Sequence, residues 1–459
     1  MKRPVVIASN RGPVSFEIRD DELIASRGAG GLVSGLGPLV QDTDTQWYAA
    51  ALSEGDRRAG ATGTMEAAGF MVRIVDIDRE TLDGAYNTIA NGTLWYLYHG
   101  LNARSREPII NIDWYDAWSA FRRYNAAFAE ALIDGAPENS IVLLQDHHLA
   151  LVAPRLRDER PDVSTVHFSH TPFATPDALR ILPELARTEL MFGYLGADAI
   201  GFHSSRWSDD FIAGCRETLG VRPTNTFVSP LGPDPAQLRA FSESPACEVE
   251  HQSLIEEVGD RVVIARAERL ELSKNLLRGF LAYDELLALR PELHEEIVFV
   301  ANLAPSRTDL DDYISYREEI EAAVDEINAR WRTPTWTPII YRAENNFARA
   351  VAMFRRYDLL LVNSIRDGLN LVAKEGPLIN ERNGIVALSR ETGAFDELSG
   401  LVTEVHAYDI TQTAQAMSDA LNIDAETKAE IATDLVAVIE SRTPKEWLQE
   451  QLAAAVTPD

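Results

Sequence analysis

Residues 359–362 form an unbroken apolar run, Leu-Leu-Leu-Val, that ends in a polar turn and is followed by a helical pattern. Such a run is typical of a parallel strand that is covered on both faces. Asp367 and Gly368 therefore fall at the carboxyl end of a buried strand, where a helix begins. Because open α/β sheets bind their ligands at this edge, the segment predicts both a fold class and the place of a site.

The chemistry of this turn suits a nucleotide-sugar. N–H groups at the start of a helix can bind a phosphate, and Gly368 lets the backbone approach it closely. Asp367 would instead accept hydrogen bonds from hydroxyl groups, because a carboxylate repels a phosphate. Glu375, further along the helix, could hold two neighbouring hydroxyls, such as those of a ribose. The alternative is an ordinary strand-to-helix turn with an aspartate that caps the helix.

Strands alternate with helices in both halves of the chain. Three prolines and a glycine within residues 229–235 mark a linker between the halves. We therefore predict one domain over residues 1–232, a second over 233–438, and a C-terminal helix over 439–459 that crosses back to the first. The expected fold class is α/β, with two Rossmann-like, doubly wound parallel sheets. The expected strands include residues 5–9, 46–52, 69–75, 140–145 and 165–169 in the first half, and 261–267, 296–303, 338–342, 358–363, 384–389 and 400–405 in the second.

Composition narrows the classes of partner. The 459 residues carry a formal net charge of −28, which argues against nucleic acid and anionic membranes as partners. No apolar run approaches the length of a membrane span, and the start of the chain turns polar too soon for a signal peptide. Two cysteines, Cys215 and Cys247, lack metal-ligand spacing and fit a reduced, cytoplasmic setting. No cluster of metal ligands is apparent in the sequence, and a homo-oligomer is compatible with it.

A glycine-rich segment, residues 28–37, also leads into a helical pattern. It lacks the Rossmann fingerprint, because its third glycine is out of register, and it lacks the Lys-Ser/Thr of a Walker A loop. Gly30 and Gly31 would let the backbone approach a diphosphate or a sugar closely. The alternative is a mobile surface loop.

Polar residues follow two neighbouring strands of the first half. Asp146 comes after residues 140–145, and His170 comes after residues 165–169. Matching positions at the ends of parallel strands favour a site over a purely structural role. Residues 86–99 are rich in aromatic side chains, which fit either core packing or the wall of a sugar site.

Short motifs follow one another in order along nearly the whole chain. They are Ser9-Asn10-Arg11, Gly30-Gly31-Leu32, Tyr86 with Trp95, Asp146-His147-His148, His170-Thr171-Pro172-Phe173, Glu268-Arg269-Leu270, Ser273-Lys274, Ser306-Arg307 and residues 366–375. Together they resemble the trehalose-6-phosphate synthases, a family of retaining glycosyltransferases. The resemblance implies the GT-B fold, in which two Rossmann-like domains face each other and the active site lies in the cleft between them.

The resemblance also implies a role for each matching residue. The catalytic residues would be Arg269 and Lys274 on the donor diphosphate, with Asp367 and His170 at the donor sugar. The remaining donor contacts would come from Gly30, Gly31, Leu369, Asn370, Leu371, Val372 and Glu375. The acceptor site would be formed by Arg11, Trp47, Tyr86, Trp95, Asp146 and Arg307, with the two arginines on the phosphate of glucose-6-phosphate.

The implied reaction moves glucose from a nucleotide-glucose to glucose-6-phosphate with retention, giving trehalose-6-phosphate. The leaving phosphate oxygen would accept the proton of the acceptor hydroxyl on the same face of the sugar. No metal or other cofactor would be needed, because arginine and lysine neutralise the developing charge.

Two segments depart from the family pattern. Residues 269–275 read Arg-Leu-Glu-Leu-Ser-Lys-Asn in place of Arg-Leu-Asp-Tyr-x-Lys-Gly, and residues 47–50 read Trp-Tyr-Ala-Ala in place of Trp-x-Gly-Trp. These variants resemble an actinobacterial branch that includes users of GDP-glucose, which favours GDP-glucose over UDP-glucose. The alternative is an aminocyclitol-coupling pseudoglycosyltransferase, or a synthase with another phosphorylated acceptor. A catalytically dead sensor would have lost some of the donor residues, and all of them are present.

Overall fold

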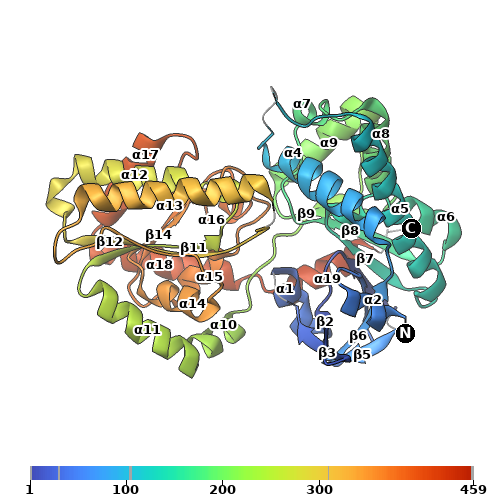
Figure 1. Ribbon diagram of the computed structural model, residues 1–459, viewed down its shortest axis with the longest axis horizontal. Helices are drawn as coiled ribbons and strands as arrows, with labels where there is room; N and C mark the ends of the chain where they lie inside the picture. The colour runs from blue at the N-terminus through green and yellow to red at the C-terminus, as the bar shows by residue number, and fades with distance from the viewer. Residues whose placement is uncertain (1–2, 29–30, 62, 103–105, 309, 456–459) are drawn as a thin grey trace. The chain divides into compact units, whose positions relative to one another are not determined.

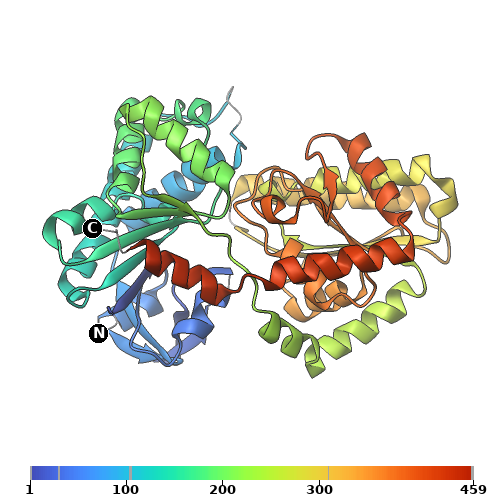
Figure 2. The same ribbon diagram turned by 180° about the vertical axis from the view of Figure 1, so that it is seen from behind.

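The computed structural model describes residues 3–28, 31–61, 63–102, 106–308 and 310–455. The chain forms two compact units: unit 1 joins the residues up to Leu231 with those from Pro444 onward, and unit 2 is Gly232–Thr443. Figures 1 and 2 show them from opposite sides. The chain thus passes between units at residues 231–232 and 443–444, where we predicted 232–233 and 438–439. The second crossing is later because helix α18 (Ala425–Glu440) continues past residue 438.

Unit 2 is built on a six-stranded parallel sheet with the strand order β13-β12-β11-β14-β15-β16. This is the order of a Rossmann sheet, in which the direction of winding reverses between β11 and β14. The carboxyl ends of these two strands therefore flank the place where such sheets bind ligands. The strands are β11 (Val262–Arg269), β12 (Ile297–Ala304), β13 (Ile339–Arg342), β14 (Leu359–Val362), β15 (Ile385–Ser389) and β16 (Thr403–Val405).

Helices cover both faces of the unit 2 sheet. In Figure 1, α12, α13 and α17 lie on one face, and α11, α14, α15 and α18 lie on the other. Apolar side chains such as Phe280 and Phe299 fill the space between sheet and helices. The helices are α10 (Pro235–Ser242), α11 (Pro245–Val258), η3 (Leu272–Lys274), α12 (Leu276–Leu289), η4 (Pro291–Leu293), α13 (Asp311–Trp331), α14 (Phe347–Arg356), α15 (Val372–Ile379), α16 (Phe395–Leu398), α17 (Ile410–Leu421) and α18.

Unit 1 contains an eight-stranded sheet with the order β10-β9-β8-β7-β1-β4-β6-β5, parallel except for β5. Its direction of winding reverses between β1 and β7, so their carboxyl ends flank a second ligand-binding edge. The strands are β1 (Val5–Ser9), β4 (Gln46–Ala50), β5 (Met65–Ala67), β6 (Phe70–Val75), β7 (Ile141–Gln145), β8 (Ser164–Ser169), β9 (Ala199–Phe202) and β10 (Thr226–Val228). The two sheets confirm the predicted α/β class with two Rossmann-like domains.

Within unit 1, β1 is followed by a hairpin of β2 (Val14–Arg19) and β3 (Glu22–Arg27), which forms a separate two-stranded sheet. Its two turn residues, Asp20 and Asp21, both have positive φ angles of 50° and 65°. Positive φ at both central positions is the geometry of the two-residue turns that match strand twist. Asp20 and Asp21 therefore form the tight turn that closes this hairpin.

The helices of unit 1 include a segment from the far end of the chain. Helix α19 starts at Pro444, a residue suited to a first helical position, and contacts β8 and α1. Figure 2 shows α19 in dark red beside the strands of unit 1. The helices are α1 (Gly31–Val40), α2 (Glu54–Gly60), α3 (Arg79–Leu82), η1 (Asp83–Leu94), α4 (Trp95–His99), α5 (Ile112–Gly135), η2 (His147–Leu149), α6 (Ala153–Glu159), α7 (Pro176–Leu179), α8 (Glu184–Leu195), α9 (Ser205–Leu219) and α19 (Pro444–Ala454). Among the described residues, no helix combines the length and the apolar character that crossing a membrane requires.

Candidate active site

The edge of unit 2 between β11 and β14 holds a compact ionic cluster. Lys274, in the turn η3 after β11, places its Nζ 2.5 Å from Oδ2 of Asp367, which follows β14. A second carboxylate, Oε1 of Glu268 on β11, lies 3.9 Å from the same nitrogen. Burial alone would lower the pKa of Lys274, but the carboxylates of Asp367 and Glu268 outweigh it and raise that pKa. Lys274 is therefore a fixed cation at the ligand-binding edge.

Backbone and amide contacts hold Asp367 in place. Asn370 Nδ2 lies 3.1 Å from Oδ2 of Asp367 and 3.1 Å from Oε1 of Glu268, so one amide joins the two carboxylates. The N–H of Asp367 donates to the carbonyl of Glu391, and its own carbonyl accepts from the N–H of Gly393. Because the backbone of Asp367 is bonded to Glu391 and Gly393, which follow β15, its carboxylate has a defined direction for binding hydroxyl groups.

An ion pair that supports this cluster was not predicted. Arg266, fully buried on β11, forms a 3.0 Å ion pair with Glu268, whose side chain is 1% exposed. Arg266 also donates to the backbone carbonyl of Lys274. Arg266 and Glu268 alternate along the strand and so share one face. Charged residues at alternate positions of an otherwise apolar strand are the sequence signal that could have revealed this support.

Arg269 pairs with a different carboxylate from the one that Lys274 contacts. Its guanidinium lies 2.8 Å from Glu271, while 62% of its side chain remains exposed. Glu271 is itself buried and accepts a hydrogen bond from Ser306. The two predicted phosphate-binding cations therefore share one edge of unit 2, each beside its own acid.

Leu369, Asn370 and Leu371 lead into α15, which begins at Val372 next to this cluster. Asn370 has a φ of 74°, and its Oδ1 accepts from the N–H of Ala373 in the first turn of the helix. The first N–H groups of a helix have no partner within the helix, so this end can accept an anion. The predicted strand-turn-helix geometry is confirmed here.

Glu375 lies one turn into α15 and is half-buried. Burial raises the pKa of its carboxyl to about 7. A carboxylate that loses solvation without a compensating cation is suited to a ligand that brings hydroxyl donors.

In unit 1, a second group of predicted residues meets at the edge between β1 and β7. Arg11, after β1, donates from Nη2 to the hydroxyl of Tyr86 on η1 at 3.2 Å. The ring of Tyr86 stacks on the ring of His148, with centroids 5.8 Å apart. His148 approaches Oδ2 of Asp146 at 3.9 Å. The structure thus brings together Arg11, Tyr86 and Asp146, which the sequence placed in one site.

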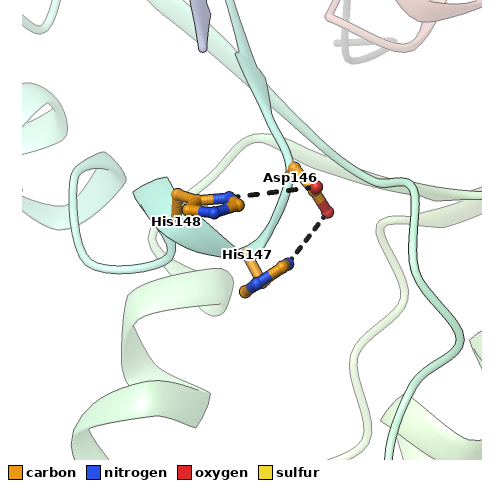
Figure 3. Close-up of side chains that lie close together, drawn as sticks. All are labelled: Asp146, His147 and His148. Carbon is orange, nitrogen blue, oxygen red and sulfur yellow. Dashed lines mark hydrogen bonds and ion pairs between the residues drawn. The ribbon is translucent and has the colours of Figure 1, made fainter. Parts of the chain in front are cut away.

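Asp146 stands at a sharp turn with a φ of 73°. Figure 3 shows its carboxylate beside the rings of His147 and His148, and Oδ1 lies 3.1 Å from His147 Nδ1. Burial opposes ionisation of Asp146, but His147 and His148 outweigh it and hold its pKa well below the usual range. Asp146 is accordingly a carboxylate that can accept hydroxyl hydrogen bonds at neutral pH.

The turn also gathers ligand atoms of a kind that metals bind. One atom each from Asp146, His147 and His148 lie within 4.8 Å of one another. No metal-ligand cluster is apparent in the sequence, because three adjacent residues show no characteristic spacing. In this structure His147 Nε2 is already 3.2 Å from the carbonyl of Ala90.

His170 lies beside this group at the end of β8. The backbone N–H of His170 donates to Oδ1 of Asp146 at 3.4 Å. Its ring lies between Gln145, 2.9 Å from Nε2, and His203, 3.2 Å from Nδ1. Burial lowers the pKa of His170, so a neutral ring is favoured.

The three other residues predicted for the acceptor site, Trp47, Trp95 and Arg307, lie in different surroundings. Trp47 is fully buried, and its indole N–H donates to Ser9 Oγ at 2.7 Å, which in turn donates to the carbonyl of Arg11 at 2.6 Å. Trp95 is buried on α4 against His99. Arg307, in unit 2, donates to the hydroxyl of Tyr313 and lies 5.4 Å from the centre of its ring.

Only one of the two glycines of the predicted donor loop falls within the described residues. Gly31 is the first residue of α1. Gly30 lies outside the described residues.

Comparison with known proteins gives consistent results. Residues 3–456 match the sequence model of glycosyltransferase family 20. The chain is 29% identical over 467 residues to the alpha,alpha-trehalose-phosphate synthase (UDP-forming) of Schizosaccharomyces pombe, covering 97% of this chain and 89% of that protein.

Solved structures agree with this match. One described as "Trehalose-6-phosphate from E. coli bound with UDP-2-fluoro glucose" has a TM-score of 0.86 at 25% identity, covering 99% of this chain and 100% of the other. The N-terminal domain of the Candida albicans trehalose-6-phosphate phosphatase has a TM-score of 0.87 at 22% identity, covering 99% of this chain and 98% of the other. The second likeness is one of fold alone.

Proposed function

Since the chain belongs to glycosyltransferase family 20, we propose that it moves glucose from a nucleotide-glucose to glucose-6-phosphate and releases trehalose-6-phosphate. The observation that carries this proposal is the cluster of Lys274, Asp367, Asn370 and Glu268 at the ligand-binding edge of unit 2. It offers a cation for a phosphate and a fixed carboxylate for sugar hydroxyls within one group. The name of the fission yeast relative, a trehalose-phosphate synthase, supports the same reaction.

The donor would lie along this edge in the order of its parts. Lys274 and Arg269 would meet the diphosphate, together with the N–H groups at the start of α15. Asp367 would accept hydrogen bonds from the sugar hydroxyls. Glu375 would accept them from the ribose, because burial raises the pKa of its carboxyl and no basic side chain among the described residues forms an ion pair with it. Ribose hydroxyls supply the donors that would stabilise the ionised form.

The acceptor would be held by the second group of residues. Arg11, positioned by Tyr86, would bind the phosphate of glucose-6-phosphate, and Arg307 would provide a second cation. Asp146 would accept hydrogen bonds from the sugar, since its pKa keeps it ionised. Trp95 would complete the acceptor side. Trp47 would act indirectly, because its indole is in the core and reaches Arg11 only through Ser9.

We propose a transfer on one face of the donor sugar. The bond between the anomeric carbon and the diphosphate oxygen breaks, the acceptor hydroxyl oxygen bonds to that carbon, and its proton passes to the leaving phosphate oxygen. A double displacement would require a carboxylate as nucleophile. Asp367 is unsuited to that role, because its Oδ2 already contacts Lys274 and Asn370. Arg269 and Lys274 would neutralise the leaving group, so the proposal includes no metal or other cofactor.

For the nucleotide we propose GDP-glucose as the preferred donor, with UDP-glucose as the competitor. The preference rests on the resemblance of residues 269–275 and 47–50 to a branch that includes GDP-glucose users. The fission yeast relative is named as UDP-forming, which supports the competitor. A direct comparison of donors therefore decides between them.

The test is to incubate the protein with GDP-glucose or UDP-glucose, with and without glucose-6-phosphate, and to measure nucleotide release and disaccharide phosphate. We expect product only when donor and acceptor are both present, and faster turnover with GDP-glucose. Absence of turnover with either donor would contradict the proposed reaction. Turnover only with a phosphorylated cyclitol would instead identify the pseudoglycosyltransferase activity.

A further inference from the structure

A chain of four hydrogen bonds runs through the ring of His170 in unit 1. The N–H of Leu231 lies 3.3 Å from His203 Nδ1, and His203 Nε2 lies 3.2 Å from His170 Nδ1. His170 Nε2 lies 2.9 Å from Gln145 Oε1. Gln145 Nε2 then lies 3.1 Å from Oε1 of Gln451 on α19. The chain begins at the last residue of unit 1 before the crossing and ends on the helix that follows the return.

The direction of this chain is fixed by its first member. A backbone N–H can only donate, so His203 Nδ1 must accept and His203 must carry its proton on Nε2. That proton is donated to His170 Nδ1, which leaves the His170 proton on Nε2 for Gln145 Oε1. The amide N–H of Gln145 then donates to Gln451. Every donor meets an acceptor only if both histidines are neutral.

Helix α19 supplies more than the terminal amide. The ring of Trp447, one turn before Gln451, lies 5.1 Å from Phe168, 5.7 Å from His170 and 6.3 Å from His203. Glu450 accepts a 2.5 Å hydrogen bond from Ser229. The helix thus packs on the rings and closes the hydrogen-bonded chain at the same place.

We propose that Gln451 and His203 are positioning residues for the transfer reaction, which hold His170 as a neutral ring with its proton on Nε2. This rests on the proposed function only in assigning His170 to the donor sugar. Both ring nitrogens of His170 are engaged within the protein, so the ring serves as a fixed surface beside the site. It does not act as a general acid or base, because gaining or losing a proton would break the chain.

The kinetic test compares two glutamines of the same helix. Gln451→Met keeps the length of the side chain but removes its acceptor, and Gln449→Met changes an exposed residue two positions away. We expect Gln451→Met to lower kcat about fivefold to tenfold, the rate equivalent of one lost hydrogen bond, with KM for donor and acceptor nearly unchanged. Equal kinetics for Gln451→Met and Gln449→Met would overturn the proposal.

A spectroscopic test does not depend on turnover. ¹⁵N NMR of the histidine side chains, assigned with His170→Gln, should show His170 as the neutral Nε2–H form near pH 7. In Gln451→Met the signal should move toward a mixture of the two neutral forms, while Gln449→Met leaves it unchanged. A cationic ring, or the Nδ1–H form, in the unaltered protein would refute the proposal even if the enzyme is fully active. If instead no donor is turned over but the NMR pattern is as expected, only the proposed function fails.

Discussion

Replacing Lys274 with methionine separates the two roles that the structure gives this lysine. Methionine keeps the apolar stem and removes the ammonium group, whose Nζ lies 2.5 Å from Asp367. The hydrogen bond from Arg266 to the backbone carbonyl of residue 274 does not involve the changed atoms. Effects on stability and on rate can therefore be assigned to the lost charge.

The expected loss of stability follows from the burial of the pair. The Lys274 and Asp367 side chains are 12% and 15% exposed, so the change leaves a largely buried carboxylate without its cation. Breaking a buried pair costs roughly 3–5 kcal/mol. We expect about 3 kcal/mol, the lower end of that range, because Asn370 still donates to Asp367 and some water can reach it.

The rate should fall for a different reason. Lys274 would neutralise the leaving diphosphate, and loss of one such group costs about 10²-fold or more in kcat, by analogy with oxyanion-hole donors. The assay is steady-state nucleotide release, paired with urea unfolding. Lys428→Met is the matched control, because Lys428 Nζ donates to the backbone carbonyl of Leu421, the last residue of α17.

A second substitution decides whether the reasoning holds. Asp367→Asn removes the carboxylate that Lys274→Met leaves unpaired, so the double variant should be nearly as stable as Asp367→Asn alone. Its rate should remain as low as that of the slower single variant. Losses of stability that simply add, or a kcat of Lys274→Met equal to that of Lys428→Met, would refute the assignment.

Three further outcomes follow from the same geometry. Arg307→Ala should raise KM for glucose-6-phosphate at least tenfold and KM for the donor little; equal effects in steady-state kinetics would contradict its place on the acceptor. Tyr86→Phe removes the hydroxyl that holds Arg11, so KM for glucose-6-phosphate should rise about fivefold, and an unchanged KM would show that Arg11 is positioned otherwise. In the folded protein the pKa of Glu375 is about 7, above its ordinary value of 4.5, so the folded state binds more protons between these values and stability falls as pH rises from 4.5 to 7. Glu375→Gln should flatten that decline in thermal unfolding curves and should raise KM for the donor. An identical decline in both proteins would contradict the burial of this carboxylate.

The sequence predicted the edges of the two sheets better than the interior of the site. Asp367 and Asp146 were found because each follows an unbroken apolar run, a pattern that locates the carboxyl end of a parallel strand. The ion pair of Arg266 and Glu268 was missed, although these two charged residues interrupt the apolar pattern of β11. Their partners come from segments that are distant in sequence, and only the folded chain shows that Glu268 meets Asn370 of another strand-helix turn.

The family resemblance places Arg269 and Lys274, which lie five residues apart after one strand, together on the donor diphosphate. In the structure Lys274 is balanced by Asp367 and Arg269 by Glu271. The spacing of two basic residues gives no information about acids that approach from elsewhere, so the compensating charges could not be predicted.

Two of the departures from the family pattern, at positions 271 and 275, can be explained by contacts in the structure. Position 271 has glutamate where aspartate is common, and Glu271 still supplies a buried carboxylate to Arg269. Position 275 has asparagine where glycine is common; its φ is 60°, a conformation that asparagine tolerates better than other side chains. The Asn275 amide also donates to the carbonyls of Asn363, at 2.9 Å, and Ala407, at 2.5 Å, which join β14 and β16 to this turn. At these two positions the chain thus keeps a buried acid beside Arg269 and the turn that carries Lys274.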